Sequence, residues 1–544
     1  MNEFERLIKL NLNASKKAKL STAYELSLKY LLQAEKYLSK FKNPWNEIFN
    51  LTKQTYFELT ELHYLNVQFE KMEESIATLL QHTHDLSEVM HSYRLLINYY
   101  TTISDYEKAI RSGEEALRYF DITLPKDNLH NLCELEFKQI NKFLKLKSVE
   151  TLINMPEMKD SKKVLALTIL STLMPAAYLY NSQMWTYIVL KSVNSILEGG
   201  ISDQVYSLSG FGIILGSVFK DYKKGHAFAE IALQIAEKFQ NKAEITKTAS
   251  VVANYTLPFR EHLKNAAEIN KRCLDMGKES GEFQHLSYSL VFNILNLFFT
   301  GKNIGSILTD VIPKHMLLCK QAKSSIGKDT INAVRLLILG MTTSPDDKME
   351  LEVINDYAHK FLADWKENNN FITVFIFKTL RIIKYFIIGD YEKAHEQVTR
   401  AKTYLNYAFG TYTSCEYNFY ESLVLCALAT TAEPNTKQEY LKTVKINQAQ
   451  MKLWSRSCPE NFHHKYLLVE AELCRLKGHF WRASKLYDEA IEEAHKNEYL
   501  HIEAIGNELC ANLYNQLDKF KIMRSYIMES HYLYSRWGSI EKVS

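Results

Sequence analysis

Hydrophobic residues recur along this chain with the spacing of an α-helix almost from end to end. They stand at positions i, i+3, i+4 and i+7, as in "AAYLYNSQMWTYIVLKSVNSIL" (176–197), and runs that alternate with a period of two are hard to find. Turn residues and prolines interrupt the pattern at 41–47, 123–128, 343–348, 432–437 and 457–461. The sequence therefore predicts an all-α protein whose helices are joined by short connections.

A second, longer period is superimposed on the helical one. The stretch "SDYEKAIRSGEEALRYF" (104–120) recurs in altered form as "GDYEKAHEQVTRAKTYL" (389–405) and "GHFWRASKLYDEAIEEA" (478–494). In each copy an aromatic residue is followed by a small residue three positions later and by another ten positions later. Aligning all copies on the aromatic residue gives six anchors: Phe69, Tyr106, Tyr222, Tyr391, Phe480 and Phe520.

These spacings are typical of the second helix of a tetratricopeptide-like hairpin. The aromatic residue starts that helix, the residue at +3 lies where two helices cross closely, and the residue at +10 packs against the next hairpin. Because one hairpin cannot bury its faces alone, neighbouring hairpins stack. We therefore expect a tetratricopeptide-like α-solenoid, with repeats at 1–120, divergent helical hairpins at 121–345 and repeats at 346–544, all in one continuous array.

Composition and charge narrow the classes of protein that remain. The net charge of +3 is too small for 544 residues to indicate a nucleic-acid partner. The eight cysteines form no CxxC pair, which favours a reducing compartment, and the charged N-terminus is unlike a secretory signal. The most apolar candidate segment, 370–391, carries Lys378, Arg381 and Lys384, so we expect no membrane span. We predict a cytoplasmic location.

Motifs of catalysis and metal binding are missing or incomplete. No GxxxxGK[ST] loop, GxGxxG loop, GxSxG elbow or kinase signature occurs, and the glycines of "SGFGIILG" (209–216) indicate close helix packing instead. His395-Glu396 begins like the zinc motif HExxH, but Thr399 occupies the position of the second histidine. Side chains in "FHHKYLLVEAELC" (462–474) lie too far apart along a helix to share a metal ion. We expect no enzymatic activity, no cofactor, and no catalytic or metal-binding residue.

One helical face is a candidate for binding a partner. In a tetratricopeptide array the first helix of each hairpin lines the concave groove. The helix before Gly389 carries Lys378, Arg381, Lys384 and Tyr385 at spacings of three and four residues. Such a row could grip the carboxylates of a partner through charge-assisted hydrogen bonds. The alternative is an ordinary solvated helix face.

Six stretches resemble one family of proteins, in the same order along the chain. They cover residues 16–38, 64–80, 173–194, 447–478, 486–514 and 532–543. The closing block "NEL…LY…YSRWG…KV" (507–543) is the most distinctive part. The family comprises large bacterial signalling proteins that join a serine/threonine kinase-like domain, a STAND-type ATPase, a helical repeat region, a GAF sensor and a histidine kinase. The resemblance is to the helical repeat region alone and runs essentially end to end.

The resemblance implies catalytic domains on both sides of such a repeat region. The chain would then be either a fragment of a larger signalling kinase or a stand-alone relative that kept only the repeats. No catalytic motif of the family has a counterpart here, so no active-site residue carries over. In STAND-type proteins the helical repeats receive a signal and restrain the ATPase, and the resemblance therefore implies a sensor or scaffold.

These observations lead to one functional hypothesis with three alternatives. We expect a non-catalytic interaction module of bacterial signal transduction that binds a protein or peptide partner in its groove. The alternatives are a receptor for a small molecule or peptide signal, an exported bacterial effector that binds host proteins, and an enzyme whose site forms at long range. An open groove would favour a protein segment, whereas a deep, enclosed pocket would favour a small ligand. The sequence leaves the oligomeric state open.

Overall fold

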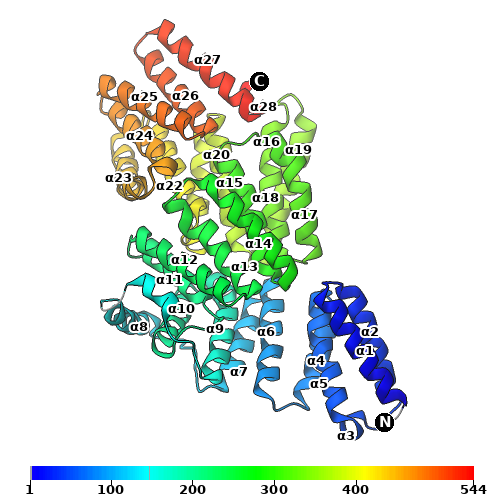
Figure 1. Ribbon diagram of the computed structural model, residues 1–544. Helices are drawn as coiled ribbons and strands as arrows, with labels where there is room; N and C mark the ends of the chain where they lie inside the picture. Colours follow the sequence, from blue (N-terminus) through cyan, green and yellow to red (C-terminus); the bar gives the residue numbers. More distant parts are fainter. Residues whose placement is uncertain (1–2, 146–147) are drawn as a thin grey trace. The chain divides into compact units, whose positions relative to one another are not determined.

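The computed structural model describes residues 3–145 and 148–544, and this part of the chain is almost entirely α-helical (Figure 1). It contains no strand, only an isolated bridge between Glu157 and Ile201. Consecutive helices pack as adjacent pairs joined by short turns, and the pairs stack on one another. The predicted all-α solenoid is confirmed.

The helices belong to two compact units. The first unit contains the residues up to Ser207 together with Lys278–Gln284, and the second contains Leu208–Gly277 and His285–Ser544. The expected division into three repeat regions stays a prediction. The first unit contains α1 (Glu3–Leu20), α2 (Tyr24–Leu38), α3 (Pro44–Glu47), α4 (Phe49–Leu65), α5 (Phe69–Leu80), α6 (Leu86–Thr102), α7 (Tyr106–Arg118), α8 (Leu129–Leu144), η1 (Val149–Asn154), α9 (Ser161–Tyr180) and α10 (Ser182–Gly199).

The second unit holds the remaining helices, of which α11, α14 and α15 each cross a boundary between the units. They are α11 (Tyr206–Ser217), α12 (Tyr222–Lys238), α13 (Lys242–Val251), η2 (Val252–Thr256), η3 (Leu257–Phe259), η4 (Leu263–Asn265), α14 (Ala266–Ser280), α15 (Phe283–Phe299), α16 (Ile304–Ser306), η5 (Ile307–Val311), α17 (Ile312–Gln321), α18 (Ser325–Thr342), α19 (Lys348–Glu367), α20 (Phe371–Ile387), α21 (Tyr391–Lys402), η6 (Leu405–Ala408), α22 (Tyr412–Leu428), α23 (Pro434–Ser457), α24 (Pro459–Leu476), α25 (Phe480–Lys496), α26 (Leu500–Gln516), α27 (Phe520–Trp537) and α28 (Ile540–Val543).

The six aromatic anchors mark helix starts, as predicted. Each is the first residue of its helix, in α5, α7, α12, α21, α25 and α27. Two residues before each anchor the backbone takes a left-handed conformation, which reverses the chain between the two helices of a hairpin. The residues with this positive φ are Val67, Ser104, Lys220, Gly389, Gly478 and Asp518. Between them and the anchors, Asp105, Asp221 and Asp390 accept hydrogen bonds from backbone N–H groups of the following turn.

The positions three and ten residues after each anchor are packing positions. All six residues at +10 are buried: Leu79, Ala116, Ala232, Ala401, Ala490 and Ser530. At +3, Met72, Ala109, Ala394 and Ala483 are fully buried, and Gly225 is buried as well. The last copy differs, because no later hairpin of the described chain packs on α27: Phe520 is 52% exposed and Met523 is half-buried.

The glycines of 209–216 serve close helix packing, as predicted. A Cβ atom at Gly212 would collide with the backbone carbonyl oxygen of Gly225, and a Cβ atom at Gly225 with that of Gly212. The backbones of α11 and α12 therefore touch at a point where only glycine fits.

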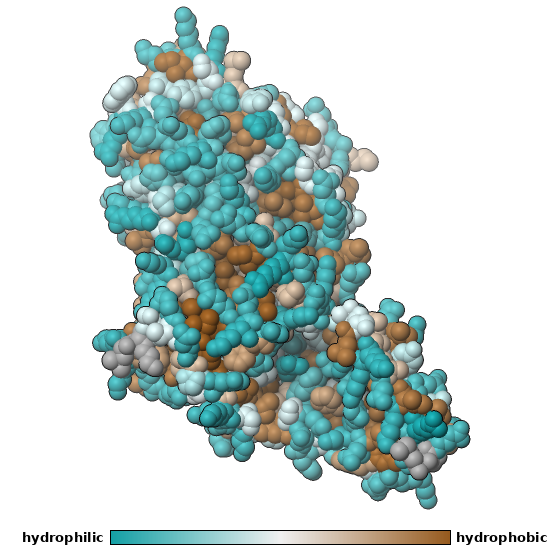
Figure 2. Space-filling model, in the orientation of Figure 1, coloured by the Kyte–Doolittle hydropathy of each residue, from teal (hydrophilic) through white to brown (hydrophobic). Residues whose placement is uncertain are grey.

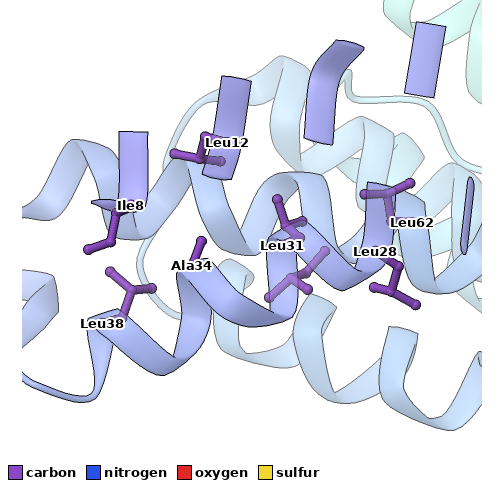
Figure 3. Packing of buried hydrophobic residues seen from close by; sticks show 8 residues of the cluster. Ile8, Leu12, Leu28, Leu31, Ala34, Leu38 and Leu62 are labelled. Atoms are coloured by element: carbon purple, nitrogen blue, oxygen red, sulfur yellow. The ribbon is translucent and has the colours of Figure 1, made fainter. Parts of the chain in front are cut away.

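Stacking of one hairpin on the next is visible at the start of the chain (Figure 3). Ile8 and Leu12 of α1 and Leu62 of α4 meet a row of apolar side chains on α2. The residues of α2 in this cluster are Leu28, Leu31, Ala34 and Leu38. Their spacing of three and four residues places them along one side of the helix, which is the pattern that predicted it.

One helix of the described residues is long and apolar enough to cross a membrane, by length and composition only. This helix is α9 rather than the segment 370–391, and 67% of its most apolar window is buried. It packs on α6, α7 and α10 within the first unit. Hydrophilic residues cover most of the molecular face in Figure 2, with hydrophobic residues in small groups between them.

Candidate binding surfaces

The row of residues predicted to grip a partner lies on α20, the first helix of the hairpin α20–α21. Its four side chains have different surroundings. Lys378 is only 2% exposed and lies inside the unit. Burial, together with the positive charges of Lys366, Arg400 and Arg381, lowers the pKa of Lys378 to about 8. The structure therefore gives Lys378 little surface with which to meet a partner.

Lys384 is engaged within the chain. Its Nζ donates a hydrogen bond to the carbonyl oxygen of Gly340 at 2.9 Å and lies 3.1 Å from a carboxylate oxygen of Glu541. Glu541 belongs to α28, which returns to pack on α18. Lys384 thereby links α20 to α18 and to the last helix.

Arg381 and Tyr385 form a pair on the half-exposed side of α20. The guanidinium of Arg381 donates to the Tyr385 hydroxyl at 2.5 Å and lies over the ring at 5.3 Å. Lys393 lies over the same ring at 5.8 Å and pairs with Asp390 at 2.7 Å. This pair is the part of the predicted row that remains available at the surface.

A groove lies beside that pair, where the C-terminal ends of the first helices of successive hairpins meet. It has a volume of about 720 Å³ and crosses α20, α22, α24 and α26. Apolar side chains of its lining include Ile388, Leu428 and Leu509, and Glu392 and Asn512 stand exposed along it. The first residues of α21 belong to it, so the repeated stretch at 389–405 forms part of its wall.

A buried ionic network supports the floor of the groove. Arg475 donates two hydrogen bonds to Glu472, from Nε at 2.9 Å and from Nη2 at 2.7 Å, and the Tyr487 hydroxyl donates to the same carboxylate. Arg475 also donates to the hydroxyl of Thr430, in the turn after α22, at 3.2 Å. Burial and the carboxylates of Glu508 and Glu472 raise the pKa of Tyr391 to about 12. Paired hydrogen bonds of this kind fix the Arg475 guanidinium in one orientation.

The N-terminal halves of α22, α24 and α26 are covered by another part of the same unit. The segment 257–265 packs on the start of α24, where Phe259 stacks on Phe462 at 5.8 Å. At the end of α15, Phe299 lies 5.9 Å from Tyr412 of α22, and Phe298 lies 5.6 Å from Trp537 of α27. The chain therefore occupies part of its own array of first helices, and the groove at the other end stays open.

Asn461 fastens the segment 257–265 to α24. Its side-chain amide donates to the carbonyl oxygens of Pro258 and Glu261 at 2.7 and 2.8 Å. Its side-chain oxygen accepts from the backbone N–H of Leu263 at 2.9 Å and from the Tyr499 hydroxyl at 2.7 Å. All the hydrogen-bonding capacity of this buried side chain is used.

Below this contact lies a buried ion pair that the sequence analysis did not single out. Lys465 of α24 pairs with Glu416 of α22, and both are almost fully buried. Lys465 also donates to the Tyr412 hydroxyl at 2.9 Å and lies over the Tyr499 ring at 5.3 Å. Burial raises the pKa of Glu416, although Lys465 acts in the opposite direction. No sequence signal could have found this pair, because it joins residues 49 positions apart.

Residues considered for metal binding are used in packing. The His395 ring lies 5.5 Å from Tyr440, and Glu396 pairs with Arg400. Within 462–474, His464 is fully buried against Tyr499, and His463 shares a hydrogen bond with Ser455. In the described residues no group of three histidine, cysteine or acidic side chains is placed to hold a metal ion.

Comparison with known proteins gives one relative at low identity. No protein-family model matches the chain. The hybrid signal transduction histidine kinase G of Dictyostelium discoideum is 21% identical over 327 residues, which covers 54% of this chain and 9% of that protein. The chain therefore spans less than a tenth of the length of this relative.

One solved structure is similar in extent but not in detail. It is a circular tandem repeat protein with novel repeat topology and enhanced subunit contact surfaces, 11% identical to this chain. The match covers 97% of this chain and 98% of that one, with a TM-score of 0.14. Because that score is too low to support an argument, the helical-repeat fold rests on the helices and turns described above.

Proposed function

We propose that this protein is a non-catalytic interaction module of a signalling protein and that it binds an extended protein segment in the groove across α20, α22, α24 and α26. The groove itself is the observation that carries the proposal. Solenoids use the surface formed by successive first helices to bind extended partners. The name of the Dictyostelium relative supports a place in signal transduction. The bacterial kinase context and the cytoplasmic location stay predictions.

The lining indicates what kind of segment would fit. Glu392 stands exposed and takes part in no ion pair of the described chain, whereas the charges of Glu472 and Arg475 neutralise each other. A partner segment with a basic side chain beside Glu392 would neutralise the charge of that carboxylate. Apolar side chains of the same segment would pack against Leu428 and Leu509. Asn512 offers an amide to the backbone of such a segment.

The predicted row extends this surface in part. Tyr385 and Arg381 lie one and two turns before Ile388 on α20, so a segment leaving the groove along α20 would meet them. We propose that Arg381 contacts a carboxylate of the partner, as the spacing of the row predicted. Lys378 and Lys384 contribute through the position of α20.

A comparison of groove and outer-face variants tests this function. The full-length chain is used as bait in cells, with Glu392→Lys and Asn512→Ala as groove variants. Lys485→Glu, on the exposed face of the outer helix α25, is the matched control. A partner retained by the control and lost by both groove variants supports the proposal. Partners that bind all variants equally would contradict it.

A further inference from the structure

A second cavity of the larger unit lies away from the groove, between the start of α12 and the helices α22 and α23. Its volume is about 540 Å³, within the range of small-molecule sites. Segment η6 and the turn before α12 close its sides, so residues about 200 positions apart meet in it. Neither the groove nor the proposed partner segment involves these residues.

One wall of this cavity is aromatic. Tyr222 and Phe259 stack with ring centres 5.0 Å apart and planes inclined by 18°. Phe259 also lies 6.4 Å from Trp454 of α23. All three residues are buried, and all three line the cavity. Aromatic faces of this kind attract flat rings and cations.

The part of the cavity lining that α22 supplies carries a carboxylate that lacks a counter-charge. Glu421 of α22 is 6% exposed. It accepts hydrogen bonds from the Tyr417 hydroxyl at 3.2 Å and from the Asn447 side-chain amide at 2.8 Å. No lysine, arginine or histidine of the described chain forms an ion pair with Glu421. A carboxylate has room for about four hydrogen bonds, so this group can accept two more.

A further acceptor lies one turn away on α22. Asn418 lines the cavity, and its side-chain oxygen is buried and has no hydrogen-bond partner in the described chain. Buried acceptors without a donor are costly, and a ligand that brings N–H groups would satisfy them. Two cations, Lys220 and Lys402, line the cavity from exposed positions, where they can meet an anionic group of the same ligand.

We propose that this cavity binds a small aromatic amine, whose ammonium group donates to Glu421 and Asn418 and whose ring lies against Tyr222, Phe259 and Trp454. An ammonium group supplies three donors and the missing positive charge. The lysines favour a ligand that also carries a carboxylate, so an aromatic amino acid fits better than a plain amine. This site is independent of the groove, and either can exist without the other.

Calorimetric titration of the full chain with three indole compounds separates the roles of the groups. Tryptophan carries the amine and the carboxylate, tryptamine the amine alone, and indole-3-acetate the carboxylate alone. Tryptophan and tryptamine are expected to bind at one site, with tryptophan tighter, and indole-3-acetate at least about tenfold more weakly than either. Equal binding of tryptophan and tryptamine would overturn the role of the lysines. Equal binding of indole-3-acetate, or no binding of either amine, would overturn the proposal.

Variants locate the binding in this cavity. Glu421→Gln keeps the shape of the side chain and removes its charge, and the affinity for tryptamine should fall about tenfold or more. Ile446 lines the mouth and is 65% exposed, so Ile446→Lys adds a positive charge there without disturbing the core. It should also weaken tryptamine, whereas Leu453→Lys, on the same helix but outside the lining, should leave the affinity unchanged. Undiminished binding by Ile446→Lys would refute the assignment even if Glu421→Gln failed to fold.

Discussion

Single ionisable side chains in the interior of the second unit set how its stability depends on pH. Lys378 and His501 are both buried, and burial lowers both pKa values, to about 8 and about 3. Because a buried charge is unfavourable, Lys378 in the folded protein loses its proton at a lower pH than an exposed lysine does. For the same reason, His501 in the folded protein stays neutral at an acidic pH at which an exposed histidine is charged. The two groups therefore act at opposite ends of the pH scale.

The first prediction concerns Lys378→Met. Below pH 8 the lysine is charged in both the folded and the unfolded protein, and burying that charge on folding costs stability. The variant should therefore unfold at a higher urea concentration than the original protein. We expect the free energy of unfolding at pH 7 to rise by about 1 to 3 kcal/mol. In the original protein stability should increase between pH 8 and the ordinary lysine pKa near 10.5, because there the unfolded chain binds more protons.

Urea denaturation at pH 7 and pH 9.5 measures the effect of Lys378→Met. The advantage of the variant should shrink at the higher pH. Lys360→Met, at an exposed lysine of α19 that does not contribute to the pKa shift of Lys378, serves as the control and should change stability little. A variant no more stable than the original at pH 7 would show that the lysine charge is not costly where it lies.

The second prediction concerns acid stability and His501→Phe. The folded pKa lies below the unfolded value near 6.5, so the stabilising effect of neutral His501 is complete above pH 6.5 and is lost as pH falls toward 3. Phenylalanine keeps the stack on Trp537, in which the ring centres are 5.2 Å apart. Between pH 6 and 4 the free energy of unfolding of the variant should fall by about 1.4 kcal/mol less per pH unit than that of the original protein.

Chemical denaturation across that pH range measures the slope for His501→Phe. Buried His464 adds to the slope in both proteins, because its pKa is lowered as well. The difference between the proteins is therefore the quantity to compare. Identical slopes would mean that His501 gains its proton without unfolding.

At the scale of the helix, the repeated anchors were fully readable from the sequence. Tyr391 begins α21 and Phe480 begins α25, and the alanines ten positions later are buried. These features depend on contacts within a hairpin and with the next hairpin, which are close in sequence. The ion pair of Lys384 could not be predicted from the sequence, because its partner Glu541 lies on the last helix, far away along the chain.

The third prediction tests the packing role of the small residue at +10. Ala490 is fully buried between hairpins, so Ala490→Leu forces a larger side chain into a filled space. We expect the free energy of unfolding to fall by about 1 to 3 kcal/mol. Glu492→Leu, an exposed neighbour on the same helix, adds the same side chain without a clash and should change stability by less. Thermal denaturation measures the stability of both variants. Equal destabilisation by the two leucines would contradict the packing role of Ala490.

At the scale of the whole unit, Asn461 holds together parts of the chain that are 198 to 203 residues apart. The segment 257–265 consists of short 3-10 turns with few hydrogen bonds of its own, so its position depends on α24. Tyr499 connects this contact to the buried Lys465–Glu416 pair, because its hydroxyl donates to Asn461 and its ring lies 5.3 Å from the Lys465 ammonium.

The fourth prediction concerns Asn461→Ala. The change leaves the carbonyl groups of Pro258 and Glu261 and the buried N–H of Leu263 without their partner. We expect a loss of about 3 kcal/mol or more in the free energy of unfolding. Hydrogen exchange of segment 257–265 should accelerate more than that of α5 in the other unit, which serves as the internal reference. Unchanged exchange in 257–265 would show that the aromatic contacts alone hold the segment.

By itself, the sequence determined the helices, the turns between them, the anchors and the absence of familiar catalytic motifs. All of these depend on local spacing, since residues that are close in the sequence determine where a helix forms and how it packs on its hairpin partner. The tertiary structure alone decided which polar side chains are accessible. Lys378 became buried, Lys384 acquired partners on α18 and α28, and Glu421 came to line a cavity together with Tyr222 and Phe259, which are far away in the sequence. The reason is that the chain packs on itself between residues about 200 positions apart, and no periodic pattern records which of its faces will meet.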